Sequence, residues 1–147
     1  MDSTTNRNVA LLSIHPEFAN KIFDGSKSIE LRRIKLRDEV QHVIVYVTSP
    51  IMRVVGYFDI EEIVEETPEF IWRTYGAVAG IDRERFFQYY DQRDLAVGIK
   101  IRRTHLLPRP KKLSFLSPKL TPPQSIQYLP FSTILKLRSA NPEKRAA

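Results

Sequence analysis

The sequence predicts an α+β protein with a small barrel-like β-sheet of about five to six strands and two or three helices at its rim. Short runs of alternating apolar residues recur along the chain, helical patterns interrupt them, and no regular strand–helix–strand alternation is present. The 147 residues suit one domain, and a content of 42% hydrophobic and 27% charged residues is typical of a globular protein with a real core.

Three elements are expected near the start of the chain. Val9–Ile14 is a short apolar run typical of a buried strand. Pro16 suits the first turn of a helix, and Gly25 should end that helix. Ser28–Arg32 alternates strictly between apolar and polar residues, which predicts a half-buried strand with its polar side chains on one face.

Three strands and two helices are expected in the middle of the chain. Val43–Val47 alternates, and Arg53–Val64 predicts a long strand in which Gly56 marks a bulge or a close approach. A helix should begin at Pro68, and a second helix should cover 82–90. Leu95–Thr104 alternates again and predicts a further strand.

The next part of the chain changes in composition. Six of the ten prolines lie between Pro108 and Pro130, and proline has no N–H to donate to a neighbouring strand. We therefore expect 106–130 to be an extended, basic segment that wraps around the domain rather than a central strand. A last short element of open type is expected at Phe131–Arg138.

The expected domain covers 9–138, including the proline-rich segment, with disordered ends at 1–8 and 139–147. The chain has no cysteine, which excludes a disulfide scaffold, a thiolate metal site and a cysteine nucleophile. Its three histidines are scattered without ligand spacing, so no metal or cofactor is expected. The first ten residues are polar and no apolar run is long enough for a membrane helix, so we expect a cytoplasmic protein without membrane contact.

Charge is distributed unevenly along the chain. Residues 1–99 carry 12 Lys+Arg and 16 Asp+Glu, whereas residues 100–147 carry 11 Lys+Arg and one acid. A basic segment beside a near-neutral body suits phosphate contacts, and a solubilising tail is the alternative. The candidate nucleic-acid contacts are Arg102, Arg103, Arg109, Lys111 and Lys112.

The densest group of reactive side chains is Lys27, Glu30 and Arg32. On a strand, residues two apart lie on the same side, so Glu30 and Arg32 should share a face, with Lys27 at its rim. The three could bind one small polar ligand in a pocket, where buried charges must be paired. The alternative is a solvated strand face with a weak surface ion pair.

The stretch Gly25-x-Lys27-x-x-Glu30-x-Arg32 resembles the G-x-K-x-x-E-x-R signature of ASCH domains, which belong to the PUA-like superfamily. The stretches 12–16, 49–56 and 122–125 are similar to a branch described as predicted transcriptional regulators, so the resemblance covers roughly residues 10–130. It implies a PUA-like β-barrel whose cleft holds the signature residues. Proposals for the family range from RNA binding to hydrolysis.

More distantly, the chain resembles a bacterial N4-acetylcytidine amidohydrolase, which removes acyl groups from the exocyclic nitrogen of cytidine. That relative shares the residues that match Gly25, Lys27 and Arg32, but its proposed nucleophile is a threonine at the position of Glu30. Its second carboxylate aligns near Val78–Gly80, where this chain has no acid. The resemblance therefore implies a similar site, but it does not imply the same catalytic mechanism.

The candidate catalytic residues are Lys27 and Glu30. Glu30 would activate water as a general base, and Lys27 would stabilise an oxyanion or act as a base itself. Arg32 would position Glu30 or the substrate, because a guanidinium stays protonated. Ser28 is near enough to be a nucleophile, although nothing obvious activates it, and His15 either lines the cleft or begins the helix.

Aromatic residues supply further candidates. Trp72 and Tyr75 would stack on a base, with a role in the hydrophobic core as the alternative. A second aromatic group covers too much of its helix for all members to be buried, so one or two should face a partner or the cleft: Phe86, Phe87, Tyr89 and Tyr90.

Three functions remain open from the sequence. The chain would recognise a nucleobase, a nucleoside or RNA and hydrolyse the amide of N4-acylated cytidines; or it would bind RNA or DNA without chemistry; or it would be a ribonuclease. The expected partner is a modified pyrimidine nucleoside or RNA, and the expected assembly is a monomer or a weak homodimer.

Overall fold

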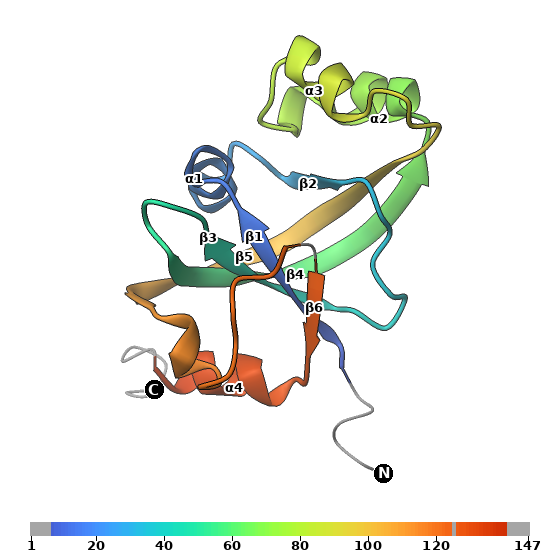
Figure 1. Cartoon of the computed structure of the whole chain (residues 1–147). Coiled ribbons are helices and arrows are strands. Elements are labelled where there is room, and N and C mark those ends of the chain that lie inside the picture. The colour runs from blue at the N-terminus through green and yellow to red at the C-terminus, as the bar shows by residue number, and fades with distance from the viewer. Residues whose placement is uncertain (1–6, 125, 141–147) are drawn as a thin grey trace.

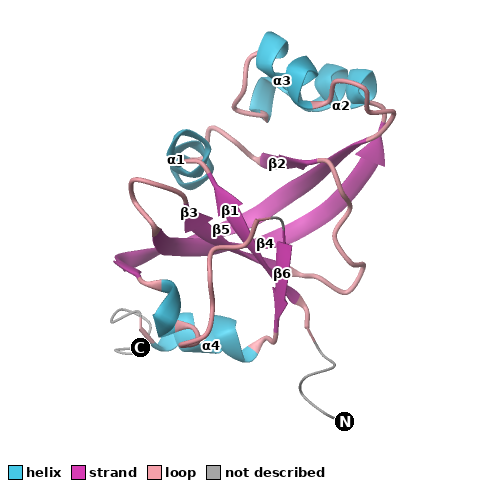
Figure 2. Ribbon diagram, in the orientation of Figure 1, coloured by secondary structure: helices cyan, strands magenta, loops and turns pink. Residues whose placement is uncertain are grey.

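The computed structural model describes residues 7–124 and 126–140. It contains one six-stranded sheet, four α-helices and two single-turn 3₁₀ helices (Figures 1 and 2). The order along the chain is β1 (Val9–Ile14), α1 (Pro16–Asp24), β2 (Ile29–Arg32), β3 (His42–Val47), β4 (Arg53–Glu66), α2 (Pro68–Tyr75), a 3₁₀ turn (Gly76–Val78), α3 (Arg83–Tyr89), β5 (Ala96–Lys111), a 3₁₀ turn (Leu113–Phe115), β6 (Ile126–Leu129) and α4 (Ser132–Ser139).

The sheet has the strand order β2-β5-β4-β3-β1-β6. Strands β1 and β3 run parallel, and the other four pairings are antiparallel. The long strands β4 and β5 curl across the molecule, so that the sheet forms a half-barrel with β2 and β6 at its edges (Figure 1). The predicted α+β class and barrel-like sheet are confirmed.

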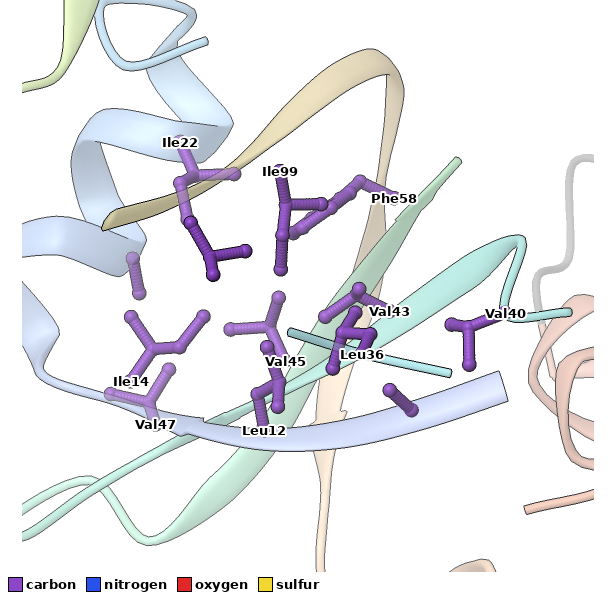
Figure 3. Close-up of a cluster of buried hydrophobic side chains, with 13 residues drawn as sticks. Leu12, Ile14, Ile22, Leu36, Val40, Val43, Val45, Val47, Phe58 and Ile99 are labelled. Atoms are coloured by element: carbon purple, nitrogen blue, oxygen red, sulfur yellow. The ribbon is translucent and has the colours of Figure 1, made fainter. Parts of the chain in front are cut away.

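Both faces of the sheet are covered near its centre. Along β1, Ala10, Leu12 and Ile14 pack with residues of α1, β3 and β5 in one buried cluster (Figure 3). The alternate residues Val9 and Leu11 pack in a second cluster, which includes residues of α4. This two-sided burial explains why β1 is apolar throughout rather than alternating.

A third apolar cluster joins β2 to helices α2 and α3. Ile29 and Leu31 point from β2 into this cluster, where they meet Ile71 and Phe86. Helices α2 and α3 lie together at one end of the molecule and α4 lies at the other end (Figure 1). The face of β2 opposite to Ile29 is thereby left for polar side chains, as the alternation of the sequence predicts.

The sequence predicts either a bulge or a close approach at Gly56, and the structure has both. The pairing of β4 with β3 shifts next to it, since Val45 pairs with Gly56 and Tyr46 with Val54. A Cβ atom at Gly56 would clash with the His105 carbonyl oxygen. A side chain would therefore push β4 and β5 apart at the bulge.

Strand β5 is longer than predicted, because it continues from Thr104 to Lys111. The expectation that strand structure ends before the prolines was wrong for this part of 106–130. Leu106 pairs with Gly56 and Lys111 with Val54, so the intervening residues of β5 form a bulge. Strand β2 pairs with β5 only from Val97 to Lys100, and the prolines therefore lie where β5 has one neighbour and needs fewer N–H donors.

After β5 the chain crosses the molecule and adds β6 antiparallel to β1. The open element at Phe131–Arg138 is helix α4, which raises the number of helices to four. The predicted disordered ends lie mostly outside the described residues. The carbonyl of Asn8, which is described, accepts a hydrogen bond from the Gln41 amide at 2.8 Å. In the described part of the chain, no helix is long and apolar enough to cross a membrane.

Candidate functional site

A pocket with a cavity volume of about 200 Å³ opens between the end of β1, helix α1, strand β2 and the α2–α3 region. Figure 1 shows α1 and β2 on the side of the sheet toward α2 and α3. The pocket brings charged, aromatic and aliphatic side chains together. The lining residues are Ser13, Ile14, His15, Phe18, Lys27, Glu30, Leu31, Arg32, Ile81 and Tyr89.

Lys27 is almost fully buried, with 3% of its surface exposed. The turn after α1 places it, because the Lys27 amide donates to the Lys21 carbonyl at 2.9 Å. Its ammonium donates to the Ala79 carbonyl at 2.6 Å and lies 3.7 Å from Glu30 Oε1. A buried ammonium needs such partners, since an uncompensated charge inside a protein costs several kcal/mol.

The backbone at Gly80 makes room for this lysine. Gly80 has φ +69°, and a Cβ atom there would lie 2.9 Å from the Lys27 Cβ. The adjoining carbonyls are also used: Ala79 accepts from Lys27, and Gly80 accepts from Lys21 at 2.9 Å. The segment between α2 and α3 is therefore shaped to close one wall around the Lys27 side chain.

Glu30 lies between two cations. Its Oε2 atom is 3.5 Å from Arg32 Nη1, and its other oxygen faces Lys27. Glu30 is 5% exposed, whereas the Arg32 side chain is 18% exposed. One buried carboxylate is thus flanked by a sheltered ammonium and a more accessible guanidinium, and the group carries a net positive charge when all three are ionised.

Burial changes the protonation of two pocket residues. It lowers the pKa of Lys27, with the attraction of Glu30 acting in the opposite direction. Burial also raises the pKa of the Tyr89 hydroxyl, and the positive charge of Arg32 partly opposes this. The neutral amine of Lys27 is therefore reached at a lower pH than for an ordinary lysine.

Aromatic side chains form the walls. The Lys27 ammonium lies 5.4 Å from the centre of the Phe18 ring, a cation–π distance. Tyr89 also lines the pocket, and its hydroxyl donates to the Leu31 carbonyl at 3.4 Å. His15 is the N-cap of α1 and also lines the pocket, and its Nδ1 lies 3.4 Å from the Thr48 hydroxyl. Both roles considered for His15 are therefore present.

The structure brings together some of the predicted site residues and separates others. Lys27, Glu30, Arg32 and His15 line one pocket. Ser28 is exposed and lies outside its lining, with its amide bonded to the Val78 carbonyl at 2.9 Å.

The predicted base-stacking residues also lie outside this pocket. Trp72 packs on Phe86 with ring centres 5.2 Å apart, and the Tyr75 ring lies 5.6 Å from the Lys100 ammonium. The aromatic pocket residues are instead Phe18 and Tyr89. For Tyr89 the excess of aromatic residues on α3 was a signal; Phe18 carried none, because its spacing in α1 is that of a core residue.

The predicted nucleic-acid contacts do not line the pocket either. Arg102, Arg103 and Arg109 are exposed on β5, beyond the residues that pair with β2. Lys111 lies 5.0 Å from the Phe115 ring, and Lys112 is exposed just after the strand. Within residues 7–124 and 126–140, no group of three or more histidine, aspartate or glutamate side chains is placed to hold a metal ion.

The curled half-barrel with a charged pocket at its rim defines a small PUA-like α+β domain. The chain belongs to the ASCH domain family, whose profile matches residues 12–105. The resemblance that residues 25–32 show to the ASCH signature is therefore confirmed over most of the chain.

Known relatives agree with this assignment. A Zymomonas mobilis protein named "ASCH domain-containing ribonuclease" is 31% identical over 133 residues, which cover 88% of this chain and 89% of the relative. The crystal structure of ASCH from Zymomonas mobilis superimposes with a TM-score of 0.82 at 28% identity and covers 90% of this chain and 95% of that one. A Ureaplasma parvum protein named large ribosomal subunit protein uL22 is 31% identical over 120 residues, but the match covers only 38% of that protein.

Proposed function

We propose that this protein binds single-stranded RNA and receives one of its bases in the pocket. The observation that carries the proposal is the convergence of Lys27, Glu30 and Arg32 in one pocket, which the rings of Phe18 and Tyr89 also line. A cavity of about 200 Å³ is small beside the roughly 300–1,000 Å³ of sites for drug-sized ligands, which suits a single flat base. RNA-binding proteins commonly splay out single-stranded bases and stack them on aromatic rings.

The charges favour a pyrimidine with an amino group, such as cytosine. Its exocyclic amino group would donate to Glu30, since acidic side chains accept from this group of cytosine. Arg32, the more accessible of the two cations beside the carboxylate, would donate to the ring nitrogen and the carbonyl beside it. A uracil offers a carbonyl in place of the amino group and would bring it against the carboxylate.

Binding of labelled oligonucleotides tests this proposal. Oligocytidine RNA should bind more tightly than oligouridine RNA, and free cytidine should compete for the site. Arg32→Gln should weaken oligocytidine binding about tenfold, since one good base contact is worth about 1–3 kcal/mol. Arg53→Gln is the matched control outside the pocket. Equal affinity for both oligonucleotides, or no effect of Arg32→Gln, would show that the pocket does not take a base.

A second candidate is RNA cleavage. Two observations favour it: the Zymomonas mobilis relative is named a ribonuclease, and burial lowers the pKa of Lys27. A neutral Lys27 amine would take the proton from a ribose 2′-hydroxyl, whose oxygen attacks the adjoining phosphorus while the 5′-oxygen leaves and takes a proton from water. Arg32 would stabilise the negative phosphoryl oxygens.

Incubation with matched RNA and 2′-O-methyl RNA separates this candidate from simple binding. Cleavage should occur only in the RNA and should stop in Lys27→Met. RNA that stays intact after long incubation with protein that binds it would remove this candidate and leave the binding proposal untouched.

A third candidate is hydrolysis of the amide of N4-acylated cytidine, with Glu30 activating water and Lys27 stabilising the oxyanion. The shared signature residues favour it. However, the Lys27 ammonium bonds to the Ala79 carbonyl, near the place where the amidohydrolase aligns its second carboxylate. Incubation with N4-acetylcytidine tests the candidate, and release of cytidine at no more than the background rate would end it.

The remaining expectations about this chain are proposals of the same kind. It would act in the cytoplasm, on RNA rather than on a membrane, as a monomer or a weak homodimer. Sedimentation of the purified protein over a range of concentrations would establish its oligomeric state.

A further inference from the structure

A second hollow adjoins the pocket and shares the side chains of Arg32 and Tyr89 with it. Its cavity volume is about 300 Å³. Three arginines from two separate parts of the chain line it: Arg32 and Arg33 at the end of β2, and Arg93 in the turn after α3. Gln124, from the segment before β6, closes another side.

Arg33 is held in a defined position. Its Nε donates to the Tyr89 carbonyl at 2.8 Å, and its guanidinium lies 4.4 Å from the centre of the Tyr89 ring. The bond uses one of five N–H donors, so four remain to bind a ligand. A guanidinium stacked on a ring loses little further freedom when it binds, which is favourable for affinity.

Arg93 is positioned by its backbone, because its amide donates to the Tyr90 carbonyl at 2.9 Å. Two acids, Asp91 and Asp94, lie near it in sequence. Among the residues that the structure describes, neither Arg33 nor Arg93 forms an ion pair with any acid within 4.0 Å. The positive charge of these two side chains is therefore not neutralised by the protein.

The field of these arginines reaches the wall shared by the two cavities. Burial raises the pKa of the Tyr89 hydroxyl, but Arg32, Arg33 and Arg93 each act to lower it. Negative charge is therefore favoured in this hollow, next to the place proposed for a base.

We propose that this hollow, which we call the arginine hollow (Arg33, Arg93 and Gln124, with Arg32 at its inner edge), binds the phosphate attached to the nucleoside whose base occupies the pocket. The inference rests on the proposed function, since it adds a phosphate position to the base position. Guanidinium groups match the geometry of phosphate oxygens and bind them with paired hydrogen bonds. The side chain of Gln124 supplies a neutral donor.

This assignment differs from the contacts suggested by charge along the sequence. Arg102 and Arg109 are exposed on β5 and line neither cavity. Arg33 and Arg93 are 60 positions apart in the chain, so a run of basic residues in the sequence does not identify them as a pair. Their common wall with the pocket links phosphate binding to base recognition within one nucleotide.

The double variant R33Q/R93Q tests the assignment. Binding of labelled hexacytidine RNA is measured by fluorescence anisotropy over about 50 to 200 mM salt, and the logarithm of affinity is plotted against that of salt concentration. The slope should become shallower by about 1.4 if two contacts are lost, at roughly 0.7 per phosphate contact on a single strand. At low salt the affinity should fall about tenfold. Free cytidine, which has no phosphate, should bind the variant as well as it binds the unchanged protein.

Two further variants make the result specific. Arg93→Gln alone leaves the packing of Arg33 on Tyr89 intact and should show about half the change in slope, which guards against a folding defect in the double variant. R73Q/K119Q removes the same charge from two exposed side chains that line neither cavity, and it should change the slope much less.

The possible outcomes separate this inference from the function on which it rests. If R33Q/R93Q binds hexacytidine with unchanged slope and affinity, or no more weakly than R73Q/K119Q does, the arginine hollow is not a phosphate site, whatever cytidine does. If R33Q/R93Q shows the expected loss but cytidine does not bind the unchanged protein, the phosphate site stands and the base pocket is refuted. A protein that binds neither cytidine nor hexacytidine refutes both.

Discussion

At the scale of single residues, the site depends on one carboxylate shared by two cations. Glu30 is nearly inaccessible to water, and its two oxygens face Lys27 and Arg32. Removing one member of a buried ion pair is far more costly than removing an exposed one, because the remaining charge loses its partner without regaining water. The same residue is thus required for stability and for the proposed recognition of a base.

Glu30→Gln keeps the shape of the side chain and removes its charge. We expect the free energy of unfolding to fall by about 3 kcal/mol, because Lys27 remains buried beside an uncharged group. Urea unfolding measures the loss. Glu61→Gln is the control: Glu61 pairs with Lys100 at 3.1 Å on the exposed surface, and its loss should cost no more than about 1 kcal/mol. Equal effects of the two variants would contradict burial of the Glu30 charge.

Lys27 should make stability depend on pH in a characteristic direction. Burial lowers its pKa below the ordinary value of 10.5. Between the folded pKa and 10.5 the unfolded chain binds more protons than the folded one, so the contribution of Lys27 to stability rises with pH across that window. Compared with Lys27→Met, the unchanged protein should therefore gain stability as the pH rises toward 10.5.

Paired urea unfolding curves of the two proteins over neutral to alkaline pH measure this difference. Subtracting the two free energies of unfolding at each pH cancels the contributions of the titratable groups that both proteins share. A difference that is independent of pH would mean that the pKa of Lys27 is not lowered on folding.

At the scale of elements, the connection between α2 and α3 shapes the pocket. Gly80→Ala should both strain a backbone with φ +69° and press a methyl group against the Lys27 side chain. Gly25→Ala is a matched control, since Gly25 has φ +88° but a methyl group added there would meet nothing within 4 Å. The left-handed backbone alone should cost about 1–2 kcal/mol at either position.

We therefore expect Gly80→Ala to lower the free energy of unfolding by more than Gly25→Ala, and to weaken oligocytidine binding while Gly25→Ala leaves it unchanged. Urea unfolding and anisotropy measure the two effects. Equal losses for the two variants would show that Lys27 is not confined by the segment at Gly80.

Away from the pocket, one carboxylate on β4 forms hydrogen bonds with histidines of both neighbouring strands. Asp59 on β4 has His42 of β3 at 2.8 Å from one oxygen and His105 of β5 at 2.9 Å from the other. Burial raises the pKa of Asp59, but the hydrogen bonds of His105 and His42 outweigh it, so the net shift is downward. The Asp59 carboxylate therefore stabilises the fold above its ordinary pKa of 3.8, and this contribution is lost as the pH falls through the lower folded value.

Asp59→Asn should remove this dependence. Above about pH 4 the loss of this carboxylate should lower the free energy of unfolding of the variant, relative to the unchanged protein, by a constant amount. Below that pH the gap between the two free energies should close. Urea unfolding between neutral and acidic pH measures the gap. A gap that widens on acidification would contradict the downward shift.

At the scale of the whole molecule, the two basic regions are separate surfaces. The arginine hollow adjoins the pocket, whereas the basic residues of β5 line neither of these two cavities. Neutralising Arg102, Arg103, Arg109, Lys111 and Lys112 together should make RNA affinity less sensitive to salt without changing the affinity for free cytidine. Anisotropy and a cytidine titration measure the two quantities. A salt slope that does not change would show that this segment makes no phosphate contacts.

Much of the fold could be predicted because local patterns and long-range packing agree. The alternation in 28–32 predicted the faces of β2, and the octapeptide that contains Lys27 predicted the family. The end of β5 was predicted wrongly, at Thr104 instead of Lys111, because the prolines were taken to exclude a central strand. Pairing on one side only, and a bulge opposite Gly56, allow the strand to continue through them.

Part of the site could be predicted from the sequence for the same reason. Lys27, Glu30 and Arg32 are close in sequence, and strand geometry is enough to bring them together. Tyr89 was one of four aromatic candidates on a single helix, and only packing decides which of them faces the pocket. Trp72 had the same spacing as a core residue and proved to pack against Phe86.

The sequence by itself therefore determined the α+β class, the family and the charged group on β2, since each depends on neighbours within a few residues. Only the tertiary structure decided that Ala79 and Gly80 enclose Lys27, that Tyr89 closes the pocket, and that Arg93 joins Arg33. The physical reason is that burial and electric fields arise from segments about 50 to 60 positions apart in the chain, such as Lys27 with Ala79 and Arg33 with Arg93. Such contacts leave no periodic pattern in the sequence.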